Sequence, residues 1–323
     1  MLLNEHFFNF FDGTRPKPTV IVSAFYKFIQ LEKTIEIKNL FNDYLKDLEI
    51  KGTILLAEEG INSTIAGNYN DMLKFFNKLS ELKKFKDIEP KYSVCNINPF
   101  LRMKVRLKNE IVTIGDKKVN PNKFVGKYLD SNEWNDFLND KSAMIIDTRN
   151  GYEVSIGSFQ NSLNPKLKSF RDFPKWVEKN LVKKNLPKET KIGMFCTGGI
   201  RCEKSTSYLK QIGFNNVYHL KGGILKYIEE IPEDKSLWNG ECFVFDYRVS
   251  VDHELNKGSF DMCFACRMPL SEEDKKNKFF LEGKSCHYCY DKTSSKQKKR
   301  FEERQKQILL AKKKNQNHIG PKF

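Results

Sequence analysis

The 323-residue sequence has no long hydrophobic run and few histidines. No apolar stretch approaches the roughly 18 residues that a transmembrane helix needs, so we expect no membrane-spanning segment. The first residues include Glu5 and Asp12 and lack both a basic start and a small-residue cleavage site, so they do not resemble a signal peptide. Only five histidines are present, and no spacing indicates a 2-His-1-carboxylate iron site, a flavin or a haem. The sequence therefore predicts a cytoplasmic protein without these cofactors.

The composition instead indicates a globular chain of two domains with room for a small third module. Hydrophobic residues make up 39% and charged residues 30%, and the mean hydropathy is −0.58. Lys and Arg outnumber Asp and Glu by 56 to 41, a net charge of +15. Residues 291–323 hold eleven of these cations and three acids, a net charge of +8. Such a basic segment is typical of contact with a phosphate backbone, and a solvated tail is the alternative.

The order of expected elements predicts a ferredoxin-like, acylphosphatase-like α+β domain over residues 1–120. Expected strands are rich in β-branched and aromatic residues, and expected helices show apolar residues at a 3.6-residue period. The strands are 19–28, two strands around a turn in 52–67, and 92–97 and 103–114. The helices are 31–48 and 71–82.

A different pattern begins after a polar connection at 120–130 and predicts an α/β domain over residues 130–236. Three short, uniformly apolar strands suit a parallel sheet that is covered on both faces. These strands are 143–147, 191–196 and 216–220, and helices are expected at 176–181 and 201–213, with Gly213 as a stop signal. Residues 237–323 then form a Cys-rich module and a basic C-terminal tail.

One loop between an expected strand and an expected helix carries a cysteine in a glycine-rich setting. Cys196 is followed by Thr197, Gly198, Gly199, Ile200 and Arg201. Backbone N–H groups and the helix N-terminus favour a thiolate at such a position, and Arg201 adds a fixed positive charge. We therefore predict that Cys196 is the nucleophile and that the rest of this loop forms its anion-binding cradle.

The spacing of the loop separates two classes of enzyme. Tyrosine phosphatases place an Arg six positions after the nucleophile, whereas position 202 here is Cys. The shorter loop resembles that of rhodanese domains, and so do Asp147, Arg149, Glu153 and Gly157 upstream and residues 213–224 downstream. A rhodanese fold without activity, or a buried structural thiol, is the alternative. Cys202 either resolves a sulfenate or persulfide on Cys196 or packs in the first helical turn.

The four cysteines of the third module form two C-x2-C pairs separated by 19 residues. Four thiolates complete a tetrahedron, so Cys263, Cys266, Cys286 and Cys289 predict a structural zinc site. Reduced thiols in a poorly ordered segment are the alternative. The basic segment 292–314 is expected to be a helix that contacts RNA or, alternatively, a protein partner. The predicted RNA contacts are Lys298, Lys299, Arg300, Lys312, Lys313 and Lys314.

Longer motifs resemble one family over nearly the whole chain. CTGGIRCEKS at 196–205, FRDFPKW at 170–176, AEEGINSTIAG at 57–67 and the double C-x2-C are similar to the tRNA uridine hydroxylase (TrhO) family of rhodanese-domain proteins. The resemblance implies hydroxylation of the wobble uridine of tRNA to 5-hydroxyuridine, with molecular oxygen as co-substrate and the active-site cysteine at Cys196. Glu58, Glu59 and Asn62 in the motif at 57–67 are further candidates for the site.

Three functions remain open at this stage. In the first, Cys196 adds to carbon 6 of the uracil ring and makes carbon 5 nucleophilic toward an oxidant. In the second, Cys196 carries persulfide sulfur to RNA or to a carrier protein. In the third, the chain is a zinc-stabilised RNA-binding protein with a vestigial rhodanese fold.

Overall fold

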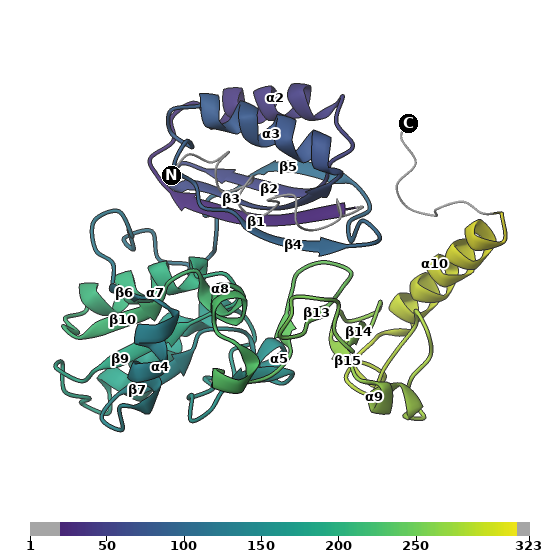
Figure 1. Cartoon of the computed structure of the whole chain (residues 1–323). Coiled ribbons are helices and arrows are strands. Elements are labelled where there is room, and N and C mark those ends of the chain that lie inside the picture. The colour runs from purple at the N-terminus through teal and green to yellow at the C-terminus, as the bar shows by residue number, and fades with distance from the viewer. Residues whose placement is uncertain (1–19, 315–323) are drawn as a thin grey trace. The chain divides into compact units, whose positions relative to one another are not determined.

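A computed structural model describes residues 20–314. The chain divides into unit 1, Met1–Cys242 with Asp252–Asn256, and unit 2, Phe243–Val251 with Lys257–Phe323. Residues 1–19 and 315–323 lie outside the described residues, and with them the first residues of the predicted N-terminal domain, Glu5 and Asp12 included, and the end of the basic tail. Figure 1 labels the elements.

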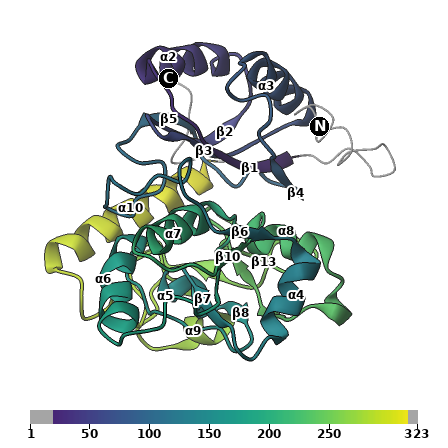
Figure 2. The ribbon, with the colours of Figure 1, turned by 90° about the vertical axis from the view of Figure 1, so that its left-hand side faces the viewer.

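The first part of unit 1 is a five-stranded sheet with the order β4-β1-β3-β2-β5. Helices α2 and α3 lie on one face of this sheet (Figures 1 and 2). In the central strands, alternate residues such as Phe25, Leu56 and Ile65 are buried in the core on the helix side. The elements confirm the predicted order: β1 (Val20–Phe28), α2 (Thr34–Leu45), β2 (Lys51–Ala57), β3 (Gly60–Gly67), α3 (Tyr69–Glu81), β4 (Lys91–Cys95) and β5 (Met103–Leu107).

The predicted strand over 103–114 is correct only as far as Leu107. Ile111 and Ile114 are buried, which gives the segment the composition of a strand. Their backbone N–H groups, however, donate to side chains, Ile111 to Glu59 Oε1 at 2.6 Å and Ile114 to Glu110 Oε2 at 3.1 Å. Carboxylates therefore satisfy the N–H groups that a neighbouring strand would otherwise bind.

The second part of unit 1 is a four-stranded parallel sheet with the order β6-β10-β9-β7. It confirms the three predicted strands and adds β6, which lies in the segment expected to be a polar connection. Only Leu129 of β6 is buried, so this strand has almost no hydrophobic signal. The elements are β6 (Lys127–Leu129), α4 (Ser131–Asn139), β7 (Met144–Asp147), α5 (Gly151–Val154), β8 (Gly157–Phe159), η1 (Phe170–Asp172), α6 (Phe173–Val177), η2 (Glu178–Val182), β9 (Ile192–Phe195), α7 (Ile200–Gln211), β10 (Val217–Leu220), α8 (Gly223–Glu230), η3 (Glu233–Lys235) and β11 (Trp238–Gly240).

Both faces of the parallel sheet are covered by helices, as a run of apolar strand residues requires. Met194 of β9 packs in a core cluster with residues of α6 and α7. Gly193, on the other face, lies so close to α4 that an added Cβ would come within 2.5 Å of the Phe137 ring. The strand β9 is therefore fixed from both sides, and the loop that carries Cys196 begins at its carboxyl end.

The rest of the chain is poor in regular structure apart from its last helix. It contains β12 (Cys242–Phe243), β13 (Ser250–Val251), β14 (Asp261–Met262), β15 (Pro269–Leu270), α9 (Glu272–Lys276) and α10 (Ser295–Lys313). A capping box of Ser294 and Gln297 begins α10, which confirms the predicted C-terminal helix. Between residues 20 and 314, no helix is long and apolar enough to cross a membrane.

Candidate active site and candidate metal centre

The cysteine loop joins the end of β9 to the first turn of α7. Cys196 directly follows β9 and is 1% exposed. Gly199 adopts φ 95°, a left-handed conformation that side chains disfavour, and its N–H donates to Cys196 Sγ at 3.2 Å. The predicted loop residues therefore form a cradle around the sulfur, and the N-terminus of α7 lies beside it.

The cradle acts on the ionisation of Cys196. Burial by itself raises the pKa of this thiol, because it disfavours the charged form. A hydrogen bond from the Cys202 thiol, the charge of Arg201 and the backbone N–H groups of residues 202 and 201 oppose burial. Together they lower the pKa of Cys196 to about 6 from the usual 9.0, so Cys196 is mainly a thiolate at neutral pH.

Cys202 lies in the first turn of α7 and is fully buried. Its sulfur lies 3.8 Å from Thr148 Oγ1, and the Thr148 hydroxyl itself donates to the Phe195 carbonyl at 2.9 Å. Burial, followed by the hydrogen bond to Cys196 and the charge on that sulfur, holds the pKa of Cys202 well above its usual value. The pair therefore consists of one thiolate and one thiol that donates to it.

Arg201 is held by a carboxylate from outside the loop. Its guanidinium donates two parallel hydrogen bonds to Glu153, 2.9 Å to Oε1 and 2.7 Å to Oε2. Both groups are buried, and Glu153 raises the pKa of Arg201 against the effect of burial. Glu153, one of the four residues of the upstream motif, therefore fixes the position of the charge that stabilises the thiolate.

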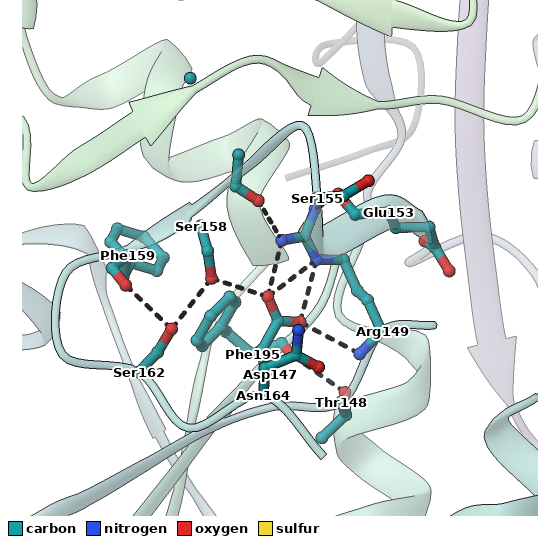
Figure 3. Close-up of polar contacts among 12 residues, drawn as sticks. Asp147, Thr148, Arg149, Glu153, Ser155, Ser158, Phe159, Ser162, Asn164 and Phe195 are labelled. Atoms are coloured by element: carbon teal, nitrogen blue, oxygen red, sulfur yellow. Dashed lines mark hydrogen bonds and ion pairs between the residues drawn. The ribbon is translucent and has the colours of Figure 1, made fainter. Parts of the chain in front are cut away.

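The other three residues of the upstream motif form a second network, and Figure 3 shows Asp147 and Arg149 at its centre. Arg149 donates to Asp147 through Nε at 2.9 Å and Nη2 at 2.6 Å. The same Nη2 donates to the Gly157 carbonyl at 2.6 Å, and Nη1 donates to the Glu153 carbonyl at 3.3 Å. This network holds the segment that carries Glu153 in place, so the motif has a positioning role.

The downstream motif closes the cradle from another side. The Ile224 N–H donates to the Cys196 carbonyl at 3.0 Å, and the Leu225 N–H donates to the Thr197 carbonyl at 3.1 Å. Gly223, at φ 71°, lies so close to the loop that an added Cβ would meet the Cys196 carbonyl oxygen at 2.5 Å. The first turn of α8 thus fixes the backbone of the cysteine loop.

Tyr26 and Lys91 of the N-terminal sheet also reach this loop, and neither was among the residues predicted for the site. The Tyr26 hydroxyl donates to Glu203 Oε1 at 2.8 Å, and it lies 2.9 Å from the position that a Cβ on Gly199 would take. Lys91 Nζ lies 5.2 Å from the Tyr26 ring centre. Burial raises the pKa of Glu203 and lowers that of Lys91, and both groups interact with the Cys196 charge.

Of the candidates in the AEEGINST segment, Glu59 is joined to the helix that follows the cysteine loop. Glu59 and Glu110 both pair with the buried Lys204 of α7. The Asn62 side chain donates to the Ile111 carbonyl at 2.9 Å, whereas Glu58 is exposed. Glu59 and Asn62 therefore hold α7 and the segment after β5, and none of these contacts involves Cys196.

The four paired cysteines of unit 2 come together as one cluster, and their sulfur atoms all lie within 4.8 Å of one another. The Cys263–Cys289 sulfur distance is 4.0 Å, and the Cys266–Cys286 distance is 3.6 Å. Zinc bonded to four thiolates at about 2.3 Å places the sulfurs about 3.8 Å apart, so the cluster fits a metal ion and is compatible with zinc. His287 lies outside the cluster, with Nε2 3.7 Å from Asp274.

Helix α10 packs against this module through Phe301 and Gln305, which are both buried. Arg304 donates to the Phe264 carbonyl at 2.7 Å and to the Gly283 carbonyl at 3.1 Å. The predicted RNA contacts lie on the rest of the helix surface. Lys298 is half-buried over the Tyr290 ring, and the exposed ones are Lys299, Arg300, Lys312, Lys313 and Lys314.

Two known protein families match separate parts of the chain. Residues 20–111 match the UPF0176 acylphosphatase-like domain, and residues 130–230 match the rhodanese-like domain. The chain is also similar to solved rhodanese structures. A rhodanese-related protein from Thermoplasma volcanium is 25% identical over 32% of this chain and 92% of that one, with a TM-score of 0.26. A rhodanese-like domain protein from Staphylococcus aureus is 25% identical over 31% and 90%, with a TM-score of 0.26.

A rhodanese-like domain from Anabaena is 18% identical over 35% of this chain and 78% of that one, with a TM-score of 0.28. The rhodanese-like match supports a sulfurtransferase or related activity for the second part of unit 1. An acylphosphatase-like N-terminal domain precedes it, and a cysteine cluster that can hold a metal follows it. The chain therefore has the domain architecture of the TrhO/UPF0176 family of proteins.

Proposed function

We propose that this protein hydroxylates the wobble uridine of tRNA to 5-hydroxyuridine, with molecular oxygen as co-substrate. The observation that carries the proposal is the Cys196 thiolate, whose pKa is lowered to about 6 in a rhodanese-type loop, in a chain with the UPF0176 N-terminal domain. A thiolate at neutral pH is the nucleophile that covalent activation of a pyrimidine requires.

In the proposed reaction the Cys196 sulfur adds to carbon 6 of the uracil ring, and carbon 5 becomes nucleophilic. Carbon 5 then attacks oxygen, one oxygen atom stays as the hydroxyl group, and the other leaves as water. Loss of the carbon 5 proton and of the Cys196 thiolate restores the ring double bond. The balance requires two electrons and two protons, which an external thiol reductant supplies.

The residues around Cys196 have defined parts in this scheme. Arg201, fixed by Glu153, stabilises the thiolate before attack and after its departure. The backbone N–H of Gly199 donates to the same sulfur. Because these donors are already oriented in the folded chain, they stabilise negative charge without further rearrangement.

We propose that unit 2 supports this activity without taking part in the chemistry. Zinc bound by Cys263, Cys266, Cys286 and Cys289 has no open coordination position, so it serves to fold the module. The exposed cations of α10, Lys299, Arg300 and Lys312 among them, then contact the tRNA backbone. We place the proposed hydroxylation in the cytoplasm.

The pairing of Cys196 with Cys202 favours one alternative, a persulfide sulfurtransferase that acts on RNA or on a carrier protein. In that reaction Cys196 carries a second sulfur atom as a persulfide anion, and the Cys202 sulfur attacks Cys196 Sγ while the Cys202 thiol proton passes to the outer sulfur. A Cys196–Cys202 disulfide forms, and the outer sulfur leaves as hydrosulfide. The buried hydrogen bond between the two thiols places Cys202 for this step.

High-accuracy mass spectrometry of tRNA nucleosides from cells with and without the gene tests both functions. Accurate mass is needed because oxygen insertion and replacement of oxygen by sulfur change the mass almost equally. Loss of 5-hydroxyuridine and its derivatives, with the oxygen atom traceable to labelled molecular oxygen, supports the hydroxylase. Loss of a thiolated nucleoside supports the sulfurtransferase, and an unchanged nucleoside profile contradicts both.

A further inference from the structure

The face of the N-terminal sheet that points away from α2 and α3 carries a row of side chains that cross all five strands. The strand register places Lys104 beside Thr53, Thr53 beside Thr64, Thr64 beside Ala24 and Ala24 beside Lys91. We call these five residues the cross-strand strip. With strands about 4.8 Å apart, the strip is about 19 Å long, which is room for a few nucleotides.

Other parts of unit 1 border the strip along both of its long sides. On one side, Val22 and Ala66 are buried with Phe100, and the Asn98 side chain donates to the Ala66 carbonyl. On the other side, Tyr26 and Asn62 bond to α7 and to the segment after β5. All five strip residues nevertheless remain partly exposed. The strip thus stays partly accessible on this face.

Both ends of the strip carry cations that form no ion pair among the described residues, although the negative charges of Cys196 and Glu203 act on Lys91. Among the described residues, neither Lys91 nor Lys104 has a carboxylate within ion-pairing distance, and the same holds for Arg102 and Arg106 beside Lys104. Burial lowers the pKa of Lys104, and the charges of Arg102 and Arg106 lower it further. Cations gathered in this way repel one another, and a bound polyanion would relieve that repulsion.

The Lys91 end of the strip lies beside the cysteine loop. Lys91 Cε lies 3.5 Å from the position that a Cβ on Gly222 would take, next to the glycine that packs on the Cys196 carbonyl. The Tyr26 ring lies between Lys91 and Gly199. An extended ligand bound along the strip would therefore lie beside the Cys196 loop at its β4 end.

We propose that the cross-strand strip binds the sugar–phosphate backbone of a single-stranded RNA loop and brings the target base to Cys196. Lys104 and Arg106 bind phosphates at one end, the Thr53 and Thr64 hydroxyls bond to phosphate or ribose oxygens, and Lys91 binds a phosphate next to the target nucleotide. The proposal rests on the proposed tRNA function and names the surface that presents the substrate. A strip with hydroxyl groups and with cations that form no ion pair suits a flexible, anionic strand.

Binding of an anticodon stem-loop RNA to the full-length protein, followed by fluorescence anisotropy over a range of salt concentrations, tests the strip. The test variant is Lys104→Ala with Arg106→Ala. The charge-matched control is Lys83→Ala with Lys86→Ala, because these exposed residues follow α3, where Phe85 packs into the core on the helix side. Both variants are also made with Lys299→Ala and Arg300→Ala, so that binding by α10 does not mask the strip.

We expect the test variant to bind the RNA about tenfold more weakly, both in the wild-type protein and in the protein with Lys299→Ala and Arg300→Ala. The slope of the logarithm of the binding constant against the logarithm of the salt concentration should become shallower by about 1.4, because each single-strand phosphate contact contributes about 0.7. The control variant should keep the RNA affinity and the salt dependence of the protein into which its two substitutions are introduced. If the RNA affinity falls equally in the test and control variants, or does not fall in the test variant, the proposal that the strip binds RNA is wrong. If the strip effect appears but cells without the gene keep their hydroxyuridine, the proposed function fails and the RNA surface stands.

Discussion

The two groups of cysteines in this chain show how surroundings decide what a thiol does. In unit 1, Cys196 and Cys202 share one helix start, and their pKa values are driven apart, that of Cys196 down to about 6 and that of Cys202 well above its usual value. In unit 2, four cysteines face one point with their sulfurs within 4.8 Å. The first arrangement gives one reactive thiolate, and the second gives a closed set of metal ligands.

The difference follows from what surrounds each sulfur. Around Cys196, the donors are backbone N–H groups and an arginine, so the negative charge stays on one sulfur and can attack a substrate. Around the unit 2 cluster, each sulfur lies 3.6 to 4.0 Å from the sulfur of another cysteine, and only a cation can hold several thiolates that close together. The predictions below test this contrast in order of expected effect.

Metal removal should have the largest effect and should be confined to unit 2. Structural zinc contributes about 10–16 kcal/mol to the folding of such modules, so Cys286→Ser or a strong chelator should unfold the segment around the cluster. Elemental analysis should show one zinc per chain in the wild type and none in the variant. Limited proteolysis should then cut residues 257–314 and leave unit 1 intact. Cys95→Ser is the control and should keep the zinc, and an intact module without metal would contradict the assignment.

Breaking the Glu153–Arg201 pair should destabilise unit 1. Glu153→Gln leaves a buried guanidinium without its counter-ion, which costs about 3–5 kcal/mol. Denaturation followed by tryptophan fluorescence measures this, since Trp134, Trp176 and Trp238 are the three tryptophans and all lie in unit 1. Glu229→Gln, which removes a more exposed partner of Lys226, should cost less than about 1 kcal/mol. Equal costs for the two variants would show that the Glu153 pair has no special role.

The ionisation of Cys196 should be visible in a pH titration. The thiolate absorbs near 240 nm, and the difference between wild type and Cys196→Ala should titrate with a midpoint of about 6. Because the pKa is lower in the folded chain than the usual 9.0, the thiolate stabilises the fold fully above pH 9, and this stabilisation is lost as the pH falls toward 6. A midpoint close to 9 would mean that the cradle does not stabilise the thiolate.

Removal of the Cys202 hydrogen bond should have the smallest effect. Cys202→Ala should raise the pKa of Cys196 from about 6 toward its usual 9.0, because the hydrogen bond from the Cys202 thiol is lost. Cys202→Ser keeps a donor at the same place and should restore most of the shift. If Ala and Ser behave alike in the same titration, Cys202 acts by packing alone. In a sulfurtransferase, both variants should in addition release less hydrosulfide.

Local sequence patterns were sufficient for most of the fold. The β-branched and aromatic residues of β1, β2 and β3 and the apolar runs of β7, β9 and β10 reflect burial of one or two faces, which is why these strands were predicted. The segment 108–114 was predicted wrongly because buried isoleucines look alike in a strand and in a loop whose N–H groups bond to carboxylates. Strand β6 was missed because Leu129 is its single buried residue.

In the candidate site too, some residues could be predicted from local sequence and others could not. The cysteine loop and the two C-x2-C pairs are each contained in a few residues, so their spacing alone shows them. The Glu153–Arg201 pair joins residues 48 positions apart, and the Tyr26–Glu203 bond joins residues 177 positions apart. No pattern in one sequence marks such partners, because the fold alone brings them together. The cross-strand strip has the same origin, since its members come from five different strands.

The central claim is that the Cys196 thiolate is required to modify the wobble uridine. The most direct measurement is the 5-hydroxyuridine content of tRNA in cells that lack the gene and carry either the wild-type protein or Cys196→Ala at equal, zinc-loaded levels. The account predicts full restoration by the wild type and none by Cys196→Ala. Normal 5-hydroxyuridine with Cys196→Ala would contradict it.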